Sequence, residues 1–210
     1  MILSLILLYV ITLIYLSITE RFRNYASIIG LQGWLLFGIA LLRLHANIGV
    51  GELLFVCAET LVFKAILVPT ILFAVIRKAK INRVTTSGST QFNSLLLSLV
   101  ALLASASITY FIADSTIDLI FFGVALYALL SGLILIVLRT RIFSHMIGFL
   151  VIENGVFLFS MAIGVEMPFL INIAILIDIL ISVLMLGIFI TRIDTNLHSG
   201  DTNVLTKVKD

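Results

Sequence analysis

Four ionisable side chains lie inside long apolar stretches of the sequence, where charged residues are rare. They are Glu59, Lys64, Glu153 and Asp178. A charge at the bilayer centre costs roughly 2.5–3.5 kcal/mol on insertion scales, so such residues normally face a protein or water-filled interior and mark an ion or proton pathway. Desolvation favours the uncharged form of carboxylates and ammonium groups alike, which brings proton exchange closer to neutral pH. We therefore predict that these four residues form a proton relay.

Lys64 is expected to reach a carboxylate on another helix. On an α-helix, Glu59 and Lys64 would be separated by about 140° around the axis and about 7.5 Å along it, so they are not an i,i+4 pair. The alternative interpretation is a static ion pair between Lys64 and one carboxylate that locks the helices together. Four further side chains are predicted to supply supporting polar contacts: His145, Asn154, Asn172 and Ser182.

Pro69 follows Lys64 in the same apolar stretch. A proline in mid-helix has no N–H to donate to the carbonyl four residues back, here that of Ala65, and its ring bends the helix. A carbonyl without its usual donor, beside a buried ammonium group, is a polar position that water could occupy. We therefore predict a hydrated bend at the centre of this helix.

The composition is that of an integral membrane protein. Of 210 residues, 61% are hydrophobic and 11% charged, and the mean hydropathy is +1.26, whereas soluble domains have about 25% charged residues. The net charge of +2 gives no reason to expect nucleic acid. The single cysteine, Cys57, excludes an intrachain disulfide and a cysteine-ligated cluster. Without paired mid-span histidines, a phosphate loop or a triad motif, we expect no cofactor, no metal and no catalysis in this chain.

Seven apolar stretches are long enough to be transmembrane helices. Their approximate ranges are 2–18, 27–42, 53–76, 94–113, 118–138, 143–164 and 168–191. We predict an all-α polytopic membrane protein with one transmembrane domain over residues 1–191 and a polar cytoplasmic tail over 192–210. The first stretch has no basic leader or cleavage site, so we expect it to be a retained span. Among the connections, the Ser/Thr/Gly-rich segment 84–90 is predicted to be flexible.

The basic residues indicate an orientation, because cytoplasmic loops carry an excess of Lys and Arg. If seven helices span the membrane, eleven of the thirteen basic residues fall on one side. These are Arg21, Arg23, Arg77, Lys78, Lys80, Arg83, Arg139, Arg141, Arg192, Lys207 and Lys209. We therefore predict an external N-terminus and a cytoplasmic C-terminus.

Glycines within the spans are interpreted as packing positions, since small residues let membrane helices approach closely. They occur at Gly30, Gly33 and Gly38 in one span and at Gly148 and Gly155 in another. The last two are seven residues apart and share a helix face.

A family resemblance is carried by residues 141–159, RIFSHMIGFLVIENGVFLF, and 167–189, MPFLINIAILIDILISVLMLGIF. These runs resemble hydrogenase-4 component E (HyfE), a membrane subunit of formate hydrogenlyase-type group 4 hydrogenases. The resemblance continues in FKAILVP at 63–69 and in the tail from 196. Residues 138–191, above all IGFLVIENG, are also similar to the K-type subunit of respiratory complex I and to the C-type subunit of multisubunit sodium/proton antiporters.

The resemblance implies a non-catalytic subunit of a large membrane arm in the cell inner membrane. In that family the K-like helices lie between a redox module and large antiporter-like subunits. The implied partners are those antiporter-like subunits and a membrane subunit of the quinone or hydrogenase module. By position, Lys64 corresponds to the family's lysine, the pair Glu153 and Asn154 to its E-N-G motif, and Asp178 to its aspartate in the last span.

The sequence departs from the family pattern at two positions. Asn172 stands where relatives have a glutamate, and the carboxylate of the complex I helix aligns with Leu150, one turn before Glu153. A move of one turn keeps the helix face but changes the depth.

The expected function is an accessory role in coupling electron transfer elsewhere to proton or sodium translocation. Two alternatives remain at this point: a C-type antiporter subunit with no redox partner, and a purely structural scaffold for assembly.

Overall fold

The computed structural model describes residues 1–44, 49–79, 88–112, 116–139, 141–163 and 177. Within these ranges the elements are helices, in agreement with the predicted all-α class. In order they are α1 (Ile2–Ile18), α2 (Phe22–Leu44), α3 (Val50–Glu59), the π-helix η1 (Thr60–Leu67), α4 (Val68–Ala79), α5 (Gly88–Ile112), α6 (Leu119–Leu138) and α7 (Ile142–Ile163).

Five helical segments in the described part are long and apolar enough to cross a membrane. They are Phe22–Arg43, Leu53–Arg77, Phe92–Ile112, Leu119–Leu138 and Phe143–Ile163. The first apolar helix, α1, is shorter, with 17 residues. The chain is therefore a multi-pass membrane protein. Apart from residue 177, the predicted seventh span, 168–191, lies outside the described residues, and with it Asn172, Asp178 and Ser182.

Two helices begin well before the predicted starts of their spans. The second begins at Phe22 instead of residue 27, and α5 begins at Gly88 instead of 94. The expectation of a flexible loop over 84–90 is thus wrong for residues 88–90. Hydropathy marks the apolar part of a span, whereas a helix extends as far as its backbone hydrogen bonds continue, so α5 begins in the polar stretch 88–91.

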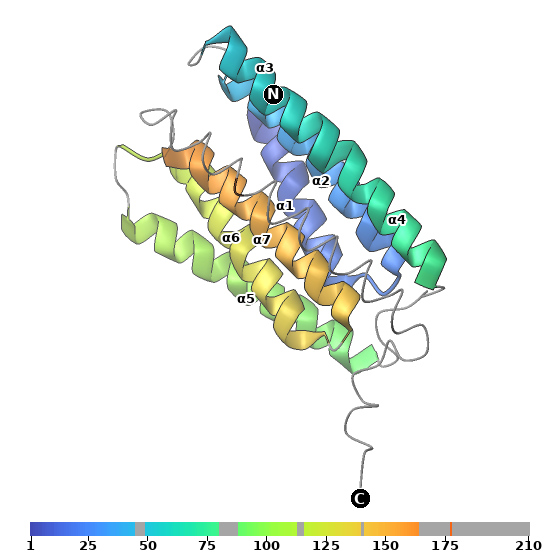
Figure 1. Ribbon diagram of the computed structural model, residues 1–210. Helices are drawn as coiled ribbons and strands as arrows, with labels where there is room; N and C mark the ends of the chain where they lie inside the picture. Colours follow the sequence, from blue (N-terminus) through green and yellow to red (C-terminus); the bar gives the residue numbers. More distant parts are fainter. Residues whose placement is uncertain (45–48, 80–87, 113–115, 140, 164–176, 178–210) are drawn as a thin grey trace, which may run out of the picture.

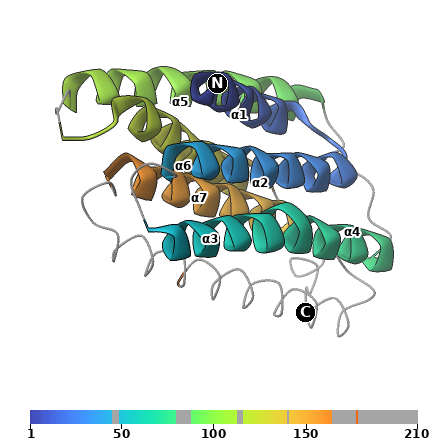
Figure 2. The same ribbon diagram turned by 90° about the horizontal axis from the view of Figure 1, so that it is seen from above.

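The helices pack in layers, with α2 and α7 in the interior (Figures 1 and 2). On one side lie α1 and α5, and on the other lies the continuous rod of α3, η1 and α4. The central α2 contacts α1, α3, η1, α4 and α7, and α7 packs most extensively on α6. Side chains on the inward faces of α2 and α7 are therefore surrounded by protein.

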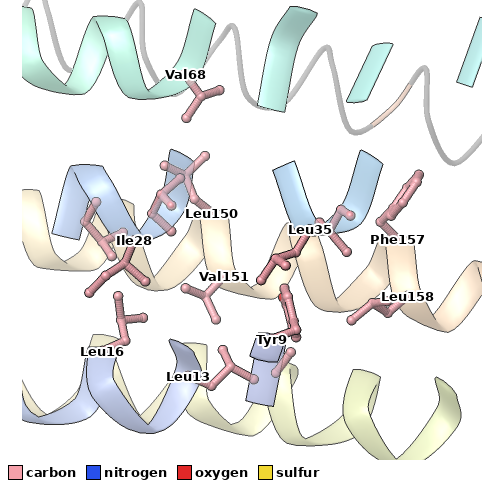
Figure 3. Close-up of a cluster of buried hydrophobic side chains, with 14 of the residues drawn as sticks. Tyr9, Leu13, Leu16, Ile28, Leu35, Val68, Leu150, Val151, Phe157 and Leu158 are labelled. Carbon is pink, nitrogen blue, oxygen red and sulfur yellow. The ribbon is translucent and has the colours of Figure 1, made fainter. Parts of the chain in front are cut away.

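The apolar core joins these layers, as Figure 3 shows. Side chains from α1, α2, α4 and α7 meet there: Tyr9, Leu13, Leu16, Ile28, Leu35, Val68, Leu150, Val151, Phe157 and Leu158. Each is at most 8% exposed. By contrast, much of α5 is exposed. Of the most apolar 18 residues of each helix, 17% are buried in α5 and 72% in α7. The interior position of α7 makes it the helix on which a buried site can be built.

Glycines bring α6 and α7 into backbone contact, which confirms that Gly148 and Gly155 are packing positions. A Cβ built on Gly148 would lie 2.7 Å from the carbonyl oxygen of Gly132, and one on Gly132 would lie 2.5 Å from that of Gly148. A Cβ on Gly155 would be 3.1 Å from the Cβ of Ala128. Close backbone approach of this kind is how membrane helices gain van der Waals contact.

Replacing Gly148 with alanine should push α6 and α7 apart. We expect the free energy of unfolding of Gly148→Ala to fall by about 1–3 kcal/mol, the usual cost of overpacking, measured as thermal unfolding in detergent. The control is Gly51→Ala, where no described atom lies within 4 Å of the added Cβ. Equal stability of the two variants would contradict the packing role of Gly148.

Candidate functional site

The ammonium group of Lys64 meets Glu153 in the middle of the bundle. The Lys64 Nζ lies 3.4 Å from Glu153 Oε1 and 3.5 Å from Asn154 Oδ1. It also lies 5.2 Å from the centre of the Phe157 ring. Lys64 is 5% exposed and Glu153 is 7% exposed. The structure thus brings together three of the predicted residues, Lys64, Glu153 and Asn154, all of them buried. Lys64 and Glu153 are 89 residues apart in the sequence.

Lys64 lies on a π-helix that ends just before Pro69. Residues Thr60–Leu67 follow the i to i+5 hydrogen-bond pattern, and the N–H of Val68 donates to the carbonyl of Phe63. The wider turn comes directly before Pro69, whose missing N–H breaks the α-helical pattern. Local π geometry is one way in which membrane helices re-pair the backbone groups that a proline releases. The Thr70 hydroxyl adds a hydrogen bond of 2.6 Å to the Ile66 carbonyl.

The π-helix changes the geometry on which the expectation for Glu59 and Lys64 rested. That expectation assumed α-helical geometry, with 3.6 residues per turn. In a π-helix, residues five apart follow one another along the same face, and Glu59 directly precedes η1. Glu59 is 5% exposed and lies within electrostatic reach of both Lys64 and Glu153. The site therefore combines one ammonium group with two carboxyl groups.

Each carboxylate keeps one oxygen without a hydrogen bond from the described residues. These atoms are Glu59 Oε2 and Glu153 Oε2, both fully buried. A buried carboxylate oxygen without a donor is costly, and one proton bound there would supply a donor and remove a negative charge. Both carboxyl groups are therefore suited to exchange protons.

Two glycines of α2 allow this helix to pack directly on the backbone around Lys64. A Cβ on Gly33 would lie 2.5 Å from the Lys64 carbonyl group and 2.7 Å from the Cα of Ala65. A Cβ on Gly30 would lie 3.2 Å from the Pro69 ring. Because no larger residue fits at position 33, the close approach of α2 and η1 depends on that glycine. The predicted packing role of these two residues is confirmed.

A chain of hydrogen bonds continues from Lys64 across α2 to α1. Asn154 Nδ2 donates to Gln32 Oε1 at 3.2 Å, and Gln32 Nε2 donates to Thr12 Oγ1 at 3.0 Å. Gln32 is fully buried. The sequence analysis missed both Gln32 and Thr12. The signal was present, since Gln32 is an amide in the middle of an apolar span, between two glycines, but only the fold shows what it contacts.

His145 does not belong to this site, which corrects its predicted supporting role. It lies in the first turn of α7, where its Nε2 is hydrogen-bonded to the Arg139 carbonyl, about 12 Å along the helix axis from Glu153. Arg139 itself is 2% exposed, and its Nη2 donates to the Ser17 carbonyl at 3.1 Å. This buried cation joins the ends of α1 and α6, where carbonyl groups concentrate negative potential.

The described residues contain no group of three His, Cys, Asp or Glu side chains that could hold a metal ion. What they do contain is a buried set of ionisable side chains: Glu59, Lys64 and Glu153. Carboxyl groups beside a cation are chemically able to take part in acid–base exchange. The predicted fourth member, Asp178, lies outside the described residues.

Comparison with protein-family models, with curated proteins and with solved structures found no match to this chain.

A double-mutant cycle should show that Lys64 and Glu153 are coupled. Lys64→Met leaves two buried carboxyl groups without this cation, and we expect it to lower the free energy of unfolding by about 3–5 kcal/mol. Glu153→Gln should cost less, because its amide oxygen can still accept from the ammonium group. The double variant should differ from additivity by about 0.5–3 kcal/mol, measured by denaturant titration in mixed micelles. Additive effects would contradict a direct interaction.

The matched control is a second, more exposed ion pair. Arg43 Nη2 lies 2.8 Å from Asp118 Oδ2, and the two side chains are 28% and 24% exposed. Asp118 also caps α6, with its side chain accepting from the N–H groups of Ile120 and Phe121, a role that asparagine fills equally well. Asp118→Asn should therefore cost about 1 kcal/mol or less.

Gly33→Ala should disturb the site without changing any of its polar side chains. The added methyl group would overlap the Lys64 peptide, so α2 and η1 must separate, and we expect a loss of about 1–3 kcal/mol in the same titration. Gly38→Ala on the same helix is the control, because its Cβ would meet only the flexible end of Leu5, at 3.3 Å. A Gly33→Ala variant as stable as Gly38→Ala would disprove the close contact.

Proposed function

We propose that this chain is an accessory membrane-arm subunit of a group 4 energy-converting hydrogenase or a related complex I-like assembly. In this role it helps couple electron transfer elsewhere in the complex to proton translocation. The proposal is supported chiefly by one observation: Glu59, Lys64 and Glu153 are buried together on membrane helices. The resemblance of residues 141–159 and 63–69 to hydrogenase-4 component E covers the same two helices.

Proton transfer in this role takes place between the two carboxyl groups. Glu59 and Glu153 both interact with Lys64, so a proton that leaves one of them increases its attraction to the ammonium group and weakens that of the other. A proton bound at the Oε2 of either residue removes the negative charge from a buried oxygen that has no described donor. Lys64 thereby links the protonation of the two carboxyl groups through Coulomb attraction, which is strong where water is excluded.

The balance of charges favours a relay over a static lock. A lock needs one cation and one anion with matched hydrogen bonds. Here the described residues place two carboxyl groups around Lys64, and the contact with Glu153, at 3.4 Å, is longer than a strong charge-assisted hydrogen bond, which measures about 2.7–2.9 Å. A cation shared between two carboxyl groups suits side chains that exchange a proton.

The proposed setting is the cell inner membrane, with an external N-terminus and a cytoplasmic C-terminus. The proposed partners are large antiporter-like subunits and a membrane subunit of the quinone or hydrogenase module. Genes for nickel–iron hydrogenase or iron–sulfur subunits beside the gene for this chain would favour this setting over an antiporter without a redox partner.

Glu153→Gln and Glu59→Gln should each weaken the coupling of electron transfer to proton translocation while the complex still assembles. In membranes of the native host we expect both variants to assemble, as judged by co-purification of the partner subunits. Redox-driven proton uptake into vesicles should fall at least severalfold, because glutamine cannot carry a proton between partners. Asp118→Asn, which alters the exposed pair far from Lys64, is the control and should pump normally.

Unchanged proton uptake in assembled Glu153→Gln and Glu59→Gln complexes would reduce the cluster to a structural ion pair. Loss of assembly in these variants, with electron transfer unaffected in whatever complex remains, would likewise support a scaffold and contradict the relay.

A further inference from the structure

The hydrogen bonds that lead from Lys64 to α1 all point in one direction. Lys64 Nζ donates to Asn154 Oδ1, Asn154 Nδ2 to Gln32 Oε1, Gln32 Nε2 to Thr12 Oγ1, and Thr12 Oγ1 to the Tyr9 carbonyl oxygen. The four donor–acceptor distances are 3.5, 3.2, 3.0 and 2.6 Å. Asn154, Gln32 and Thr12 are each at most 7% exposed. This series of hydrogen bonds links four helical elements inside the protein: η1, α7, α2 and α1.

The residues at both ends of this series of hydrogen bonds require the same donor-to-acceptor direction. The Thr12 hydroxyl donates its only hydrogen to the Tyr9 carbonyl. It can therefore only accept a hydrogen bond from Gln32. Gln32 must therefore present its NH₂ group to Thr12 and its oxygen to Asn154. Asn154 must in turn donate to Gln32, which leaves its own oxygen for Lys64. An ammonium group has donors and no acceptor, so it requires that oxygen.

We propose that Thr12 and Gln32 are positioning residues for Lys64: their one-way hydrogen bonds hold the Asn154 oxygen toward the ammonium group, so that Lys64 remains a fixed cation while protons move between carboxyl groups. This inference deepens the proposed function, and the second half of the statement rests on it. The positioning role itself follows from the geometry and applies to the chain alone.

The surroundings of Lys64 divide into groups that exchange protons and groups that do not. Among the described residues, two titratable side chains interact with Lys64: Glu59, which directly precedes η1, and Glu153 on α7. The Asn154 oxygen and the Phe157 ring stabilise the cation without titrating. The facing helix α2 contributes the Gln32 amide and the bare backbone at Gly33. Lys64 therefore keeps neutral support when Glu153 binds a proton.

The test compares Thr12→Val with Thr12→Ser. Valine has nearly the shape of threonine but accepts no hydrogen bond, so Gln32 loses the group that orients it, whereas serine retains the hydroxyl. The full-length chain, labelled with ¹⁵N-lysine in lipid nanodiscs, is observed by NMR, and the Lys64 signal is identified by its loss in Lys64→Met. The measured quantity is the pH above which the ammonium signal of Lys64 disappears.

We expect this pH to fall by about one unit in Thr12→Val, the scale of one hydrogen bond to a charged group. Thr12→Ser should keep the original value. Gln32→Leu, which removes the central link, should reproduce the effect of Thr12→Val and serves as a second variant if valine impairs folding. The control Trp34→Leu, at a 54% exposed position of α2, should leave the value unchanged.

The outcomes separate this inference from the proposed function. The same Lys64 titration in Thr12→Val, Gln32→Leu and Thr12→Ser would overturn the positioning role, whether or not the complex pumps protons. A shifted titration in the first two variants, with Thr12→Ser unshifted, would establish that role even if Glu153→Gln left pumping intact and the proposed function failed.

Discussion

The interaction on which the site depends is the contact of one ammonium group with carboxylate and amide oxygens inside an apolar bundle. An unpaired cation inside the membrane would be strongly destabilising. Lys64 therefore requires its contacts with the side-chain oxygens of Glu153 and Asn154. Those two residues lie on α7, and Lys64 lies on the rod formed by α3, η1 and α4. The two elements can meet only if α2, which contacts both, leaves room for them. The chemistry of the site therefore depends on how these three elements pack.

Two features of the local backbone contribute to this packing. A π-helix carries Lys64 ahead of Pro69, and Glu59, the residue directly before this π-helix, interacts electrostatically with both Lys64 and Glu153. The absence of a side chain at Gly33 lets α2 touch the Lys64 peptide directly. Unusual helix geometry of this type is frequent at functional sites. Here its effect is to concentrate three ionisable groups where lipid would otherwise isolate them.

Much of this arrangement could be predicted from residue types. The apolar stretches mark the helices, and rare buried charges mark the site, because both follow from the cost of placing polar groups in hydrocarbon. The pairing of Lys64 with a carboxylate on another helix was predicted and is observed. The assumption of an α-helix between Glu59 and Lys64 was wrong, because a π-helix occupies Thr60–Leu67. The role of His145 was wrong because proximity in sequence to Glu153 does not bring it to the same depth of the bundle.

The sequence by itself determined the membrane class, the all-α architecture and the charged residues that must be buried, because these depend on composition and on the spacing of residues along one helix. Only the tertiary structure decided the partners. Which oxygen faces Lys64, how Gln32 and Thr12 orient the Asn154 amide, and where Arg139 is buried all depend on contacts between helices distant in sequence. Such contacts are set by how side chains of several helices fit together, a property that no single stretch of the chain contains.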